Sequence, residues 1–408
     1  MTRRIVVVSH EIPYPPIHGG RADVWNTACG LKALGFEMLL ITWPKGTVSE
    51  SDIVQIRNVF SDVSILPRHV RISTFLPYDY PLRLKSYRIV PGELTRITRD
   101  VLAFSPDFIL LNNWSAYLAA KSLQESSHRP LVYRSQNVEH VYSRMLRERS
   151  QGLHRIKAYL NYVKAFQAEG ELRNRADMTW DISSSDKQAW DRIQEKGRSV
   201  VLPSIDPDLG ADTSVSMREE KDIDILFTGS LWSQTNLDGL YWFLREVLPK
   251  LKDTHGSSLK IAFAGSNPDD RFKAVCEAGG VDCIANPPDF GPYFRRAKIL
   301  INPVQFSSGI NVKMVRMFLT RSPVVSTVAG MRGYAHLGLR GVYGCDASTD
   351  FAARLTQLLN EHPHVEFDRA SFVQENFGLP ILRRVLAQTY ARLGMAVEWS
   401  GQGANDEA

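Results

Sequence analysis

The sequence predicts an α/β protein made of two Rossmann-like domains in tandem, and three observations support this fold class. The chain has 408 residues, which is more than one hydrophobic core usually supports. A buried strand, a glycine-containing loop, a helix and a second strand follow one another at the start of the chain, and a similar series begins again after residue 218. A hydrophobic content of 44% and a charged content of 23% are ordinary for globular proteins.

The first domain is expected over residues 1–203. The β-branched run Ile5–Val8 is typical of a central parallel strand, and the prolines and paired glycines of HEIPYPPIHGG predict a loop after it. Apolar residues from Ala22 to Leu31, spaced by three and four, predict a helix that ends at Gly35. The domain is then expected to contain strands at Met38–Thr42, Phe108–Leu111, Leu131–Arg134, Thr179–Ile182 and Val200–Leu202, with helices over Ser115–Gln124 and from Val138 to about Asn174.

Residues 204–218 are rich in Pro, Asp, Gly and Ser and are predicted to be a linker to a second domain over residues 219–378. An amphipathic helix over 379–396 is expected to cross back towards the first domain, and residues 397–408 form a polar tail. The second domain is expected to contain strands at Ile223–Phe227, Leu259–Ala264, Ile299–Ile301 and Val324–Ser326 and helices at Leu237–Leu251, Val312–Leu319 and Phe351–Leu359.

Composition and motifs argue against several classes of protein. The four cysteines have no CxxC spacing and no histidine at ligand spacing, so neither a disulfide framework nor a zinc site is expected. A net charge of +5 suits an anionic ligand or membrane surface but is too small to indicate nucleic acid. The GxSxG, HExxH, P-loop and GxGxxG motifs do not occur, so the sequence does not favour a hydrolase, zinc protease, kinase or dehydrogenase.

The sequence also predicts where the protein works. No apolar stretch approaches the roughly 18 residues that a membrane-spanning helix needs. The apolar run near the N-terminus stops after four residues, which indicates a strand and not a leader peptide. We therefore expect a cytoplasmic protein, or one bound peripherally to the inner face of the membrane.

Two loops, one in each domain, are suited to bind an anion. Gly19 and Gly20 leave backbone N–H groups accessible at the start of a helix, although a tight turn without a ligand would look the same. In SSGINVK, Gly309 precedes a helix expected near Asn311, with Lys313 in its first turn. A lysine at that place is favoured when an anion lies between it and the helix N-terminus, and a solvated lysine is the alternative. Two such loops suit one diphosphate held across a cleft.

Six segments together carry a resemblance to a known family. They are IVVVSHEIPYPPIHGGRADVW, YRSQNVEHVYSR, ADMTWDISSSDKQAW, VLPSIDPD, ILFTGSLWSQTNLDGLYWFLREVLPKL and FRRAKILINPVQFSSGINVKMVRMFLTRSPVVSTVAGMRGY. Their content and order resemble the retaining GT-B glycosyltransferases of family 4, which use nucleotide sugars to build bacterial polysaccharides and glycolipids. The resemblance spans nearly the whole chain. In the second segment Gln136 stands where the family usually has a histidine before Asn.

The resemblance implies a GT-B architecture, with two Rossmann-like domains facing each other across a cleft. It implies a nucleotide-diphosphate sugar as donor, no metal or other cofactor, and retention by front-face attack without a carboxylate nucleophile. The implied catalytic residues are His10, Gln136 and Asn137, and the implied acceptor-binding residues are Trp114 and Glu139. A histidine such as His10 is also common as a structural residue. The implied donor-binding residues are Gly19, Gly20, Gly229, Ser230, Asn236, Gly265, Ser308, Gly309, Ile310, Asn311, Lys313 and Arg316.

The sequence departs from the family pattern at the donor loops. Ser308 and Arg316 stand where family members commonly carry two glutamates, and Ser230 and Gln234 replace basic residues. An arginine can bind phosphate but cannot accept a hydrogen bond from a ribose hydroxyl. Three hypotheses follow: an active transferase acting on a glycan or lipid-linked acceptor, a catalytically silent partner of another transferase, and a GT-B nucleotide-sugar epimerase.

Two stretches of the first domain interleave cations with apolar and aromatic residues. They run from Arg68 to Arg99 and from Arg144 to Lys164. This pattern suits the headgroup region of an anionic leaflet, and the alternative is that the aromatics are core and the charges a solvated face. We therefore expect an anionic membrane surface to be a partner.

Overall fold

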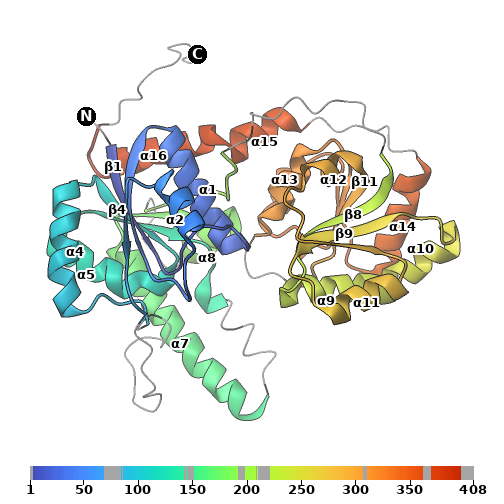
Figure 1. The fold of residues 1–408 in the computed structure, drawn as a ribbon, viewed down its shortest axis with the longest axis horizontal. Helices are drawn as coiled ribbons and strands as arrows, with labels where there is room; N and C mark the ends of the chain where they lie inside the picture. Colours follow the sequence, from blue (N-terminus) through green and yellow to red (C-terminus); the bar gives the residue numbers. More distant parts are fainter. Residues whose placement is uncertain are drawn as a thin grey trace. The chain divides into compact units, whose positions relative to one another are not determined.

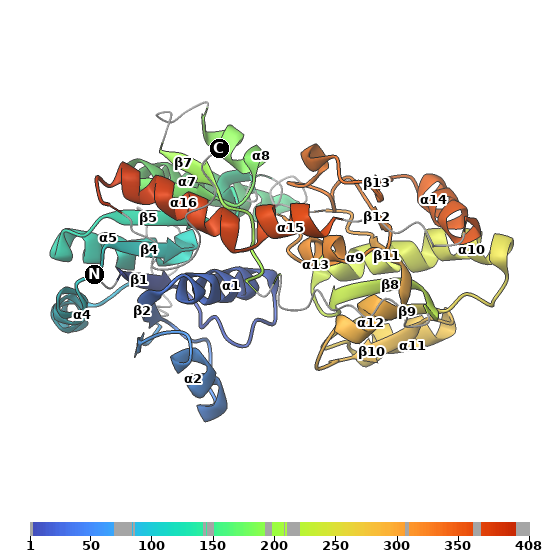
Figure 2. The same ribbon diagram turned by 90° about the horizontal axis from the view of Figure 1, so that it is seen from above.

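A computed structural model of the chain describes residues 3–68, 84, 86–141, 144, 151–191, 198–207, 209, 221–306, 310–361 and 369–396. These residues form two compact units, whose elements are drawn from two directions in Figures 1 and 2. The first unit contains the described residues up to Pro207, apart from Ile17–Gly19, together with those from Leu379 onward. The second contains Ile17–Gly19 and the described residues from Leu209 to Gly378.

The first unit is built on a parallel sheet of seven strands in the order β3-β2-β1-β4-β5-β6-β7. Ser9, the last residue of β1, pairs with Thr42 on one side and Asn112 on the other, so the loops after β1, β2 and β4 leave from the same edge. The strands are β1 Arg3–Ser9, β2 Phe36–Thr42, β3 Asp62–Ile65, β4 Phe108–Asn112, β5 Leu131–Ser135, β6 Met178–Asp181 and β7 Ser199–Val201.

Helices cover both faces of this sheet. Alternate residues of β1 point to opposite faces, so Val6 and Val8 pack with α4, α5 and α7 while Ile5 and Val7 pack with α1, α2 and α16. The helices are α1 Gly19–Ala33, α2 Glu50–Arg57, α4 Pro91–Phe104, η1 Trp114–Ala116, α5 Tyr117–Ser127, α7 Gly152–Arg175, α8 Ser184–Asp191 and α16 Leu379–Arg392.

The C-terminal helix α16 belongs to the first unit although it follows the second in sequence. Leu382 and Leu386 are buried in the same core as β1. Trp180 Nε1 donates to Thr389 Oγ1 at 2.9 Å, and the Tyr390 hydroxyl donates to Asp107 Oδ2 at 2.6 Å. This packing confirms the predicted return of the C-terminal helix.

The second unit is built on a parallel sheet of six strands in the order β10-β9-β8-β11-β12-β13. Its first strand in sequence lies between the second and fourth strands of its own series, as in the first unit. Both sheets therefore have the Rossmann-like order that the sequence predicted. The strands are β8 Ile223–Ser230, β9 Ile261–Ser266, β10 Asp282–Ala285, β11 Ala297–Asn302, β12 Val324–Ser326 and β13 Val342–Gly344.

Helices again lie on both faces. Residues of α9, α10, α11 and α14 share one core, and residues of α12, α13 and α15 share the other. The expected helix Leu237–Leu251 contains a π-helical turn, η2, because Pro249 has no N–H to donate to the carbonyl of Arg245. The helices are α9 Gln234–Trp242, η2 Phe243–Val247, α10 Leu248–His255, α11 Asp270–Ala278, α12 Gly291–Arg296, α13 Lys313–Leu319, η3 Ala335–Leu337, α14 Ser348–Asn360 and α15 Ala370–Phe377.

The segment just after β7 is packed and not extended. The sequence predicted that a linker starts at residue 204, yet Ser204, Ile205 and Asp206 are buried. Asn26 Nδ2 of α1 donates to the carbonyl of Ile205 at 2.9 Å, and the Ile205 side chain joins the core under α16. The first unit therefore continues to Pro207, and residues 208 and 210–218 of the predicted linker lie outside the described residues.

Candidate functional site

The described residues that the sequence predicted to form the site lie near the carboxyl ends of strands or in the helices that follow these strands. His10 follows β1, Gln136 follows β5, and Gly229 is the second-to-last residue of β8. In open parallel sheets this edge is where ligands bind, because helix N-termini and loops meet there. The predicted residues fall in both units, and each set is described by itself.

In the second unit, Lys313, Asn236 and Gly229 lie together at the end of β8. Lys313 Nζ donates to Asn236 Oδ1 at 2.9 Å and lies 4.2 Å from the centre of the Phe227 ring. Asn236 Nδ2 in turn donates to the Ser230 carbonyl at 2.8 Å and to Ser230 Oγ at 3.0 Å. Asn236 thus fixes the lysine against the end of the strand.

The environment of Lys313 disfavours its positive charge. Part of the residue remains accessible, but burial lowers the pKa of the Lys313 amine to about 7. Among the described residues, no carboxylate lies within ion-pair distance of Nζ, and its hydrogen-bond partner is a neutral amide. A lysine held this way can neutralise an anion that enters the site, because a buried amine regains its charge when an opposite charge arrives.

Gly229 and Gly265 are required by close packing. Gly229 has a φ of 150°, and a Cβ there would lie 3.3 Å from Asn236 Nδ2 and 3.4 Å from Lys313 Cδ. Gly265 pairs with it across β8 and β9, and a Cβ at Gly265 would lie 1.7 Å from the Gly229 carbonyl oxygen. Gly265 therefore lets two strand ends approach each other, a structural role that is sufficient to explain the glycine.

The remaining predicted donor residues of this unit have different surroundings. Asn311 Nδ2 donates to the Gly330 carbonyl at 3.0 Å, so this side chain holds the loop after β12. Ile310 packs against the core on the α13 side, and Arg316 is exposed one turn after Lys313. Ser308 and Gly309 lie outside the described residues.

In the first unit, Gln136 and Gly20 belong to one buried polar network. Gln136 Nε2 donates to the Gly20 carbonyl at 3.3 Å and to Asp23 Oδ2 at 3.1 Å. Asp23 forms an ion pair with Arg134, at 2.7 Å and 3.0 Å, and both side chains are buried. Gln136 Oε1 accepts from Asn113 Nδ2 at 3.2 Å. The network ties the start of α1 to the ends of β4 and β5.

The glycine pair does not adopt the backbone that a tight turn requires. Gly19 and Gly20 are the first residues of α1, and neither is among the described glycines with a positive φ. A Cβ at Gly19 would make only an ordinary contact. Backbone strain is therefore not the reason for these glycines, which differs from the tight-turn reading of the sequence.

His10 is paired with the carboxylate of Glu11, for which the sequence predicted no role. His10 Nε2 lies 3.5 Å from Glu11 Oε1. The His10 and Tyr87 rings meet edge-on, with their centres 5.4 Å apart. Glu11 Oε2 also lies 3.4 Å from Arg21 Nε and 3.6 Å from Lys45 Nζ. Both His10 and Glu11 are buried. Two cations and a histidine thus converge on one carboxylate after β1.

A second histidine and carboxylate follow β5 and were also missed. Glu169 of α7 is fully buried, and its Oε2 accepts from the backbone N–H of His140 and lies 3.2 Å from His140 Nδ1. Burial and the nearby charges of Glu169 and Glu139 raise the pKa of Tyr133 well above its usual value. The sequence could have indicated a buried ion pair at Arg134, because a charged residue inside an apolar strand needs a partner. His140 and Glu169 are 29 residues apart, and no pattern in the sequence relates them.

Several buried polar atoms at this edge have no hydrogen-bond partner among the residues that the structure describes. They belong to the last residues of β2 and β4 and to the turn after β4, and their side chains are buried. Such atoms usually face a bound water or ligand, since leaving one unsatisfied costs about 1–3 kcal/mol. The atoms are Thr42 Oγ1, Asn112 Oδ1, Trp114 Nε1 and Ser115 Oγ.

The other predicted residues of this unit show little accessible surface. Trp114 is only 5% exposed, its ring packs in the hydrophobic core, and its indole N–H is buried. Glu139 is also buried, and the carbonyl of Asn137 accepts from Ser135 Oγ at 3.1 Å. Trp114 and Glu139 therefore offer little accessible surface for the acceptor role that the sequence predicted.

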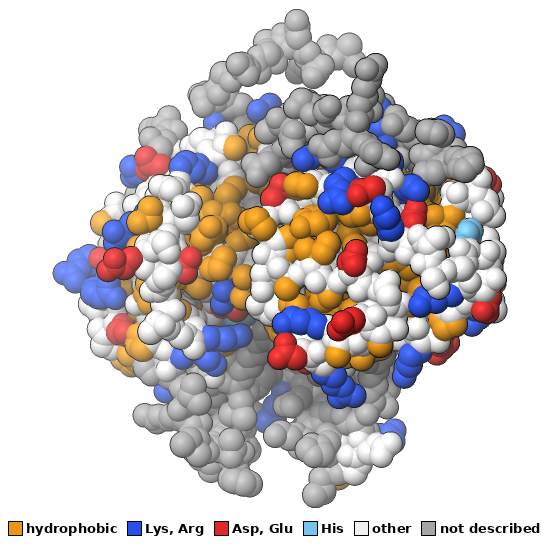
Figure 3. Space-filling view, turned by 45° about the vertical axis from the view of Figure 1, so that its right-hand side comes forward, with side chains coloured by type: hydrophobic (Ala, Val, Ile, Leu, Met, Phe, Trp, Pro, Cys, Tyr) orange, Lys and Arg blue, Asp and Glu red, His pale blue; other side chains and the backbone are white. Residues whose placement is uncertain are grey.

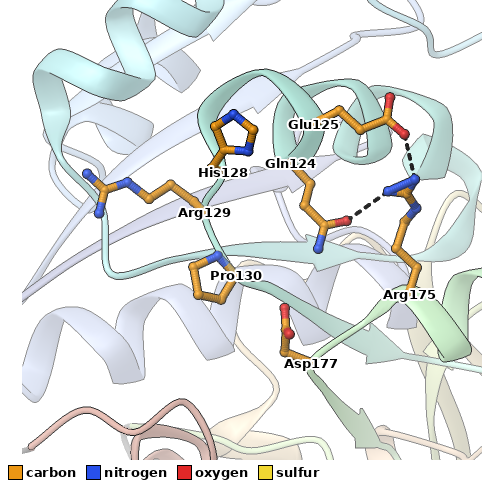
Figure 4. Close-up of a pocket in the computed structure, with 7 residues that line it drawn as sticks. All are labelled: Gln124, Glu125, His128, Arg129, Pro130, Arg175 and Asp177. Carbon is orange, nitrogen blue, oxygen red and sulfur yellow. Dashed lines mark hydrogen bonds and ion pairs between the residues drawn. The ribbon is translucent and has the colours of Figure 1, made fainter.

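A hollow of about 480 Å³ lies elsewhere on the first unit (Figure 4). It opens at the amino ends of β5 and β6, because Pro130 and Asp177 directly precede these strands. Arg175 lines it and contacts Gln124 and Glu125. None of the sequence-predicted site residues lines this hollow, whose lining residues are Gln124, Glu125, His128, Arg129, Pro130, Arg175 and Asp177.

The surface charges, the helix lengths and the grouping of possible metal ligands relate to the predictions about membrane and metal. On the face seen in Figure 3, Lys and Arg side chains are interspersed with Asp and Glu. Within the described ranges, no helix has the length and apolar character needed to cross a bilayer. Across the same ranges, no three His, Cys, Asp or Glu side chains are grouped so that they could ligate a metal ion.

Two comparisons of the sequence with known proteins found similarity, one over most of the second unit and one over nearly the whole chain. Residues 222–361 match the family described as Glycosyl transferases group 1. A protein of Klebsiella pneumoniae, described as an uncharacterized 44.6 kDa protein in the cps region, is 25% identical over 390 residues, which cover 92% of this chain and 96% of that protein.

Solved structures are similar over nearly the whole chain. Sucrose-phosphate synthase from Thermosynechococcus elongatus has a TM-score of 0.67 at 12% identity, covering 96% of this chain and 99% of its own. HepE from Anabaena, solved in complex with UDP and glucose, has a TM-score of 0.62 at 11% identity, covering 95% of this chain and 99% of its own. At these identities the likeness shows the fold, which is the GT-B fold that the sequence predicted.

Proposed function

We propose that this chain, a glycosyltransferase of GT-B fold with a group 1 domain in its second unit, transfers a sugar from a nucleotide-diphosphate sugar to a glycan or lipid-linked acceptor. The observation that carries the proposal is the buried amine of Lys313 at the carboxyl edge of the second sheet. HepE, which is similar in fold, was solved with UDP and glucose, and this supports UDP as the first nucleotide to test.

Lys313 is suited to hold the diphosphate of the donor. Its amine is fixed by Asn236 and Phe227 next to Gly229, which has no side chain of its own. A charge-assisted hydrogen bond from a buried lysine to a phosphate oxygen is stronger than one in water. As the bond between sugar and diphosphate breaks, negative charge grows on the phosphate oxygens, and the protonated Lys313 stabilises it.

We further propose that transfer proceeds with retention and without a bound metal. Lys313 supplies a positive charge at the place where the leaving diphosphate develops its negative charge. The resemblance to retaining family 4 enzymes supports front-face attack, in which the departing phosphate takes the proton of the acceptor hydroxyl. No carboxylate nucleophile is needed for that route.

The acceptor is proposed to bind at the carboxyl edge of the first sheet. The unpartnered atoms of Thr42, Asn112, Trp114 and Ser115 lie at the ends of β2 and β4. These atoms are buried, so their side chains must turn toward the edge before a sugar, whose hydroxyl groups both donate and accept hydrogen bonds, can reach them. A lipid-linked sugar acceptor would require the first unit to work at the inner face of the membrane, and we propose this peripheral location.

The test is incubation of the purified protein with a panel of nucleotide sugars, UDP-glucose included, with and without candidate acceptors. Release of free nucleotide that depends on acceptor, with the anomeric configuration of the product read by NMR, is expected for a retaining transferase. Interconversion of the sugar without release would indicate an epimerase. Absence of binding to every nucleotide sugar would contradict the proposal and favour the silent partner that the Ser308 and Arg316 departures suggest.

A further inference from the structure

Three neighbouring strands of the first sheet, β1, β2 and β3, are each followed by a cationic side chain. Arg21 lies in the first turn of α1, the helix after β1. Lys45 lies three residues after the end of β2, and Arg68 lies three residues after the end of β3. The strands are parallel and paired with one another, so these cations belong to one stretch of the carboxyl edge.

Two of these cations share one carboxylate. Arg21 Nε and Lys45 Nζ lie 3.4 Å and 3.6 Å from Glu11 Oε2. The side chains of Arg21 and Glu11 are only 14% and 7% exposed, so they form a largely buried pair. The Lys45 side chain is 51% exposed. A buried carboxylate needs one cation to balance its charge, and Lys45 therefore adds positive charge beyond that need.

Arg68 adds a further cation to the same place. Its guanidinium carbon lies 5.1 Å from the centre of the buried Tyr87 ring, which also meets the His10 and Trp43 rings edge-on. Among the described residues, no carboxylate lies within ion-pair distance of Arg68, and its buried Nε has no hydrogen-bond partner. Arg68 is thus held against the ring that His10 contacts, with its charge uncompensated.

The extra positive charge at this edge favours a ligand with an anionic group. Lys45 lies three residues after Thr42, whose hydroxyl belongs to the edge proposed to bind the acceptor. A neutral sugar gains little from two extra cations. A carboxylate on the sugar can accept charge-assisted hydrogen bonds from a lysine and an arginine, and such bonds are about twice as strong as neutral ones.

A carboxylate suits these two cations better than a phosphate. The free energy needed to remove an ion from water grows with the square of its charge, while its attraction to fixed charges grows only in proportion. A phosphate monoester carries about −1.5 to −2 charges at neutral pH. Either anion would also lie near Glu11, because Lys45 Nζ is 3.6 Å from that carboxylate. The single charge of a carboxylate keeps both costs small.

We propose that Lys45 and Arg68 bind the carboxylate of an acidic acceptor sugar, a uronic acid, and so select it over the neutral sugar with the same ring. The inference rests on the proposed function and names the chemical class of its acceptor. Arg21 stays with Glu11 and keeps that carboxylate paired while Lys45 turns to the ligand. Arg68, stacked on Tyr87, presents its guanidinium to the same carboxylate.

The test is ligand-observed NMR titration of the full chain with matched sugars, with and without saturating UDP. Methyl glucoside is compared with methyl glucuronide, and methyl galactoside with methyl galacturonide. In at least one pair the acidic sugar is expected to bind about tenfold more tightly, the value of one charge-assisted hydrogen bond at the weak end of its range. The preference should decrease at about 1 M salt, where the Debye length is about 3 Å.

The double variant Lys45→Gln, Arg68→Gln is expected to lose this preference and to keep the affinity of the wild type for the neutral sugar. The double variant Lys45→Arg, Arg68→Lys keeps both charges and should keep the preference. Arg57→Gln with Arg99→Gln is the matched control, because it removes two exposed cations of α2 and α4 and changes the net charge equally. Circular dichroism and the UDP-glucose affinity establish that each variant is folded and that its donor site is intact.

Four results would overturn the inference. Equal affinities for the acidic and neutral members of both pairs exclude an acid-binding site. An equal loss of preference in the control variant assigns the effect to overall charge. A lower UDP-glucose affinity in Lys45→Gln, Arg68→Gln assigns the cations to the donor diphosphate. Tighter binding of glucose 6-phosphate than of methyl glucuronide, lost in the same variant, assigns them to a phosphate.

Failure of the proposed function would look different. A wild-type protein that binds no nucleotide sugar contradicts sugar transfer. The preference for acidic sugars is also measured without UDP, so it is judged separately from the donor result. A protein that binds UDP-glucose but does not distinguish acidic from neutral sugars contradicts only the choice of acceptor.

Discussion

Lys313 combines three properties at the scale of one residue: it is desolvated, it donates to a neutral amide, and it lies beside a glycine at the end of a central strand. A solvated lysine, which was the alternative reading of the sequence, would keep its ordinary pKa. The lowered pKa of Lys313 and its contact with the Phe227 ring are not those of a solvated residue. The proposed donor site can therefore be tested through this one side chain.

We predict that Lys313→Ala lowers the affinity for UDP-glucose about ten- to a hundredfold, the value of one charge-assisted hydrogen bond of about 1.5–3 kcal/mol. Isothermal titration calorimetry measures the effect. Lys250→Ala on α10 is the control, because that amine contacts only the carbonyl of Glu246 among the described residues. Equal affinities of the Lys313 variant and the wild type would remove this lysine from the donor site.

We also predict that donor affinity depends on pH through Lys313. The pKa of the free amine is about 7, and a bound diphosphate favours the charged form, so the pKa of Lys313 rises in the complex. Between these two pKa values the complex holds one more proton than the free protein, so affinity should fall about tenfold per pH unit above pH 7. A nucleotide-diphosphate sugar does not itself titrate there. The slope should vanish in Lys313→Gln, and an equal slope in that variant would assign the titration to another group.

At the scale of elements, two helical glycines with opposite surroundings can be compared. Gly239 of α9 is buried, and a Cβ there would lie 2.3 Å from the carbonyl oxygen of Pro303, directly after β11. The absence of a side chain lets α9 approach the loop that follows this strand, next to the residues around Lys313. At Gly170 of α7, by contrast, a Cβ would have no described atom within 4 Å beyond its own helix backbone.

We predict that Gly239→Ala lowers the free energy of unfolding by about 1–3 kcal/mol, because backbone must move to admit the methyl group. Gly170→Ala should raise it by about 0.5–1 kcal/mol, because alanine restricts the unfolded chain and favours the helix. Urea unfolding followed by circular dichroism gives both values. A stabilising effect at Gly239 would contradict the close contact between α9 and the loop after β11.

The strands that the sequence failed to predict share a physical reason. The edge strands β3, β10 and β13 have only three or four residues, and none of their residues is buried. The apolar run that identifies a central strand is therefore missing, and their pairing with β2, β9 and β12 supplies the order. Central strands such as β1 and β8 were found because burial on both faces demands apolar residues throughout.

At the scale of the whole molecule, the return of α16 means that the first unit is completed by the last described helix of the chain. Leu382 is fully buried against β1 and α1, while Leu355 of α14 is fully buried in the second unit. The stability of each unit can thus be changed separately by one substitution of the same type.

We predict that Leu382→Ala destabilises the first unit by about 2–5 kcal/mol and leaves the affinity for UDP-glucose unchanged, because the cavity lies in the other unit from Lys313. Leu355→Ala should instead destabilise the second unit and weaken donor binding near its transition. Differential scanning calorimetry with and without UDP-glucose separates the two, since the ligand raises only the transition of the unit that binds it. A donor affinity lowered by Leu382→Ala alone would contradict this division.

Local sequence patterns predicted the two parallel sheets, most of their central strands and the return of the C-terminal helix, and they singled out Lys313 at the start of a helix. Apolar runs, glycine-containing loops and helical periodicity are local, so each can be recognised within about 15 residues. Only the tertiary structure decided which polar side chains meet. Glu169 and His140, Asp23 and Arg134, and Asn236 and Lys313 are 29, 111 and 77 residues apart, and no local pattern relates them. The close approach of β8 and β9 likewise explains Gly265 without a ligand, because the space available to a side chain is set by the neighbouring strand and not by the residues beside it in sequence.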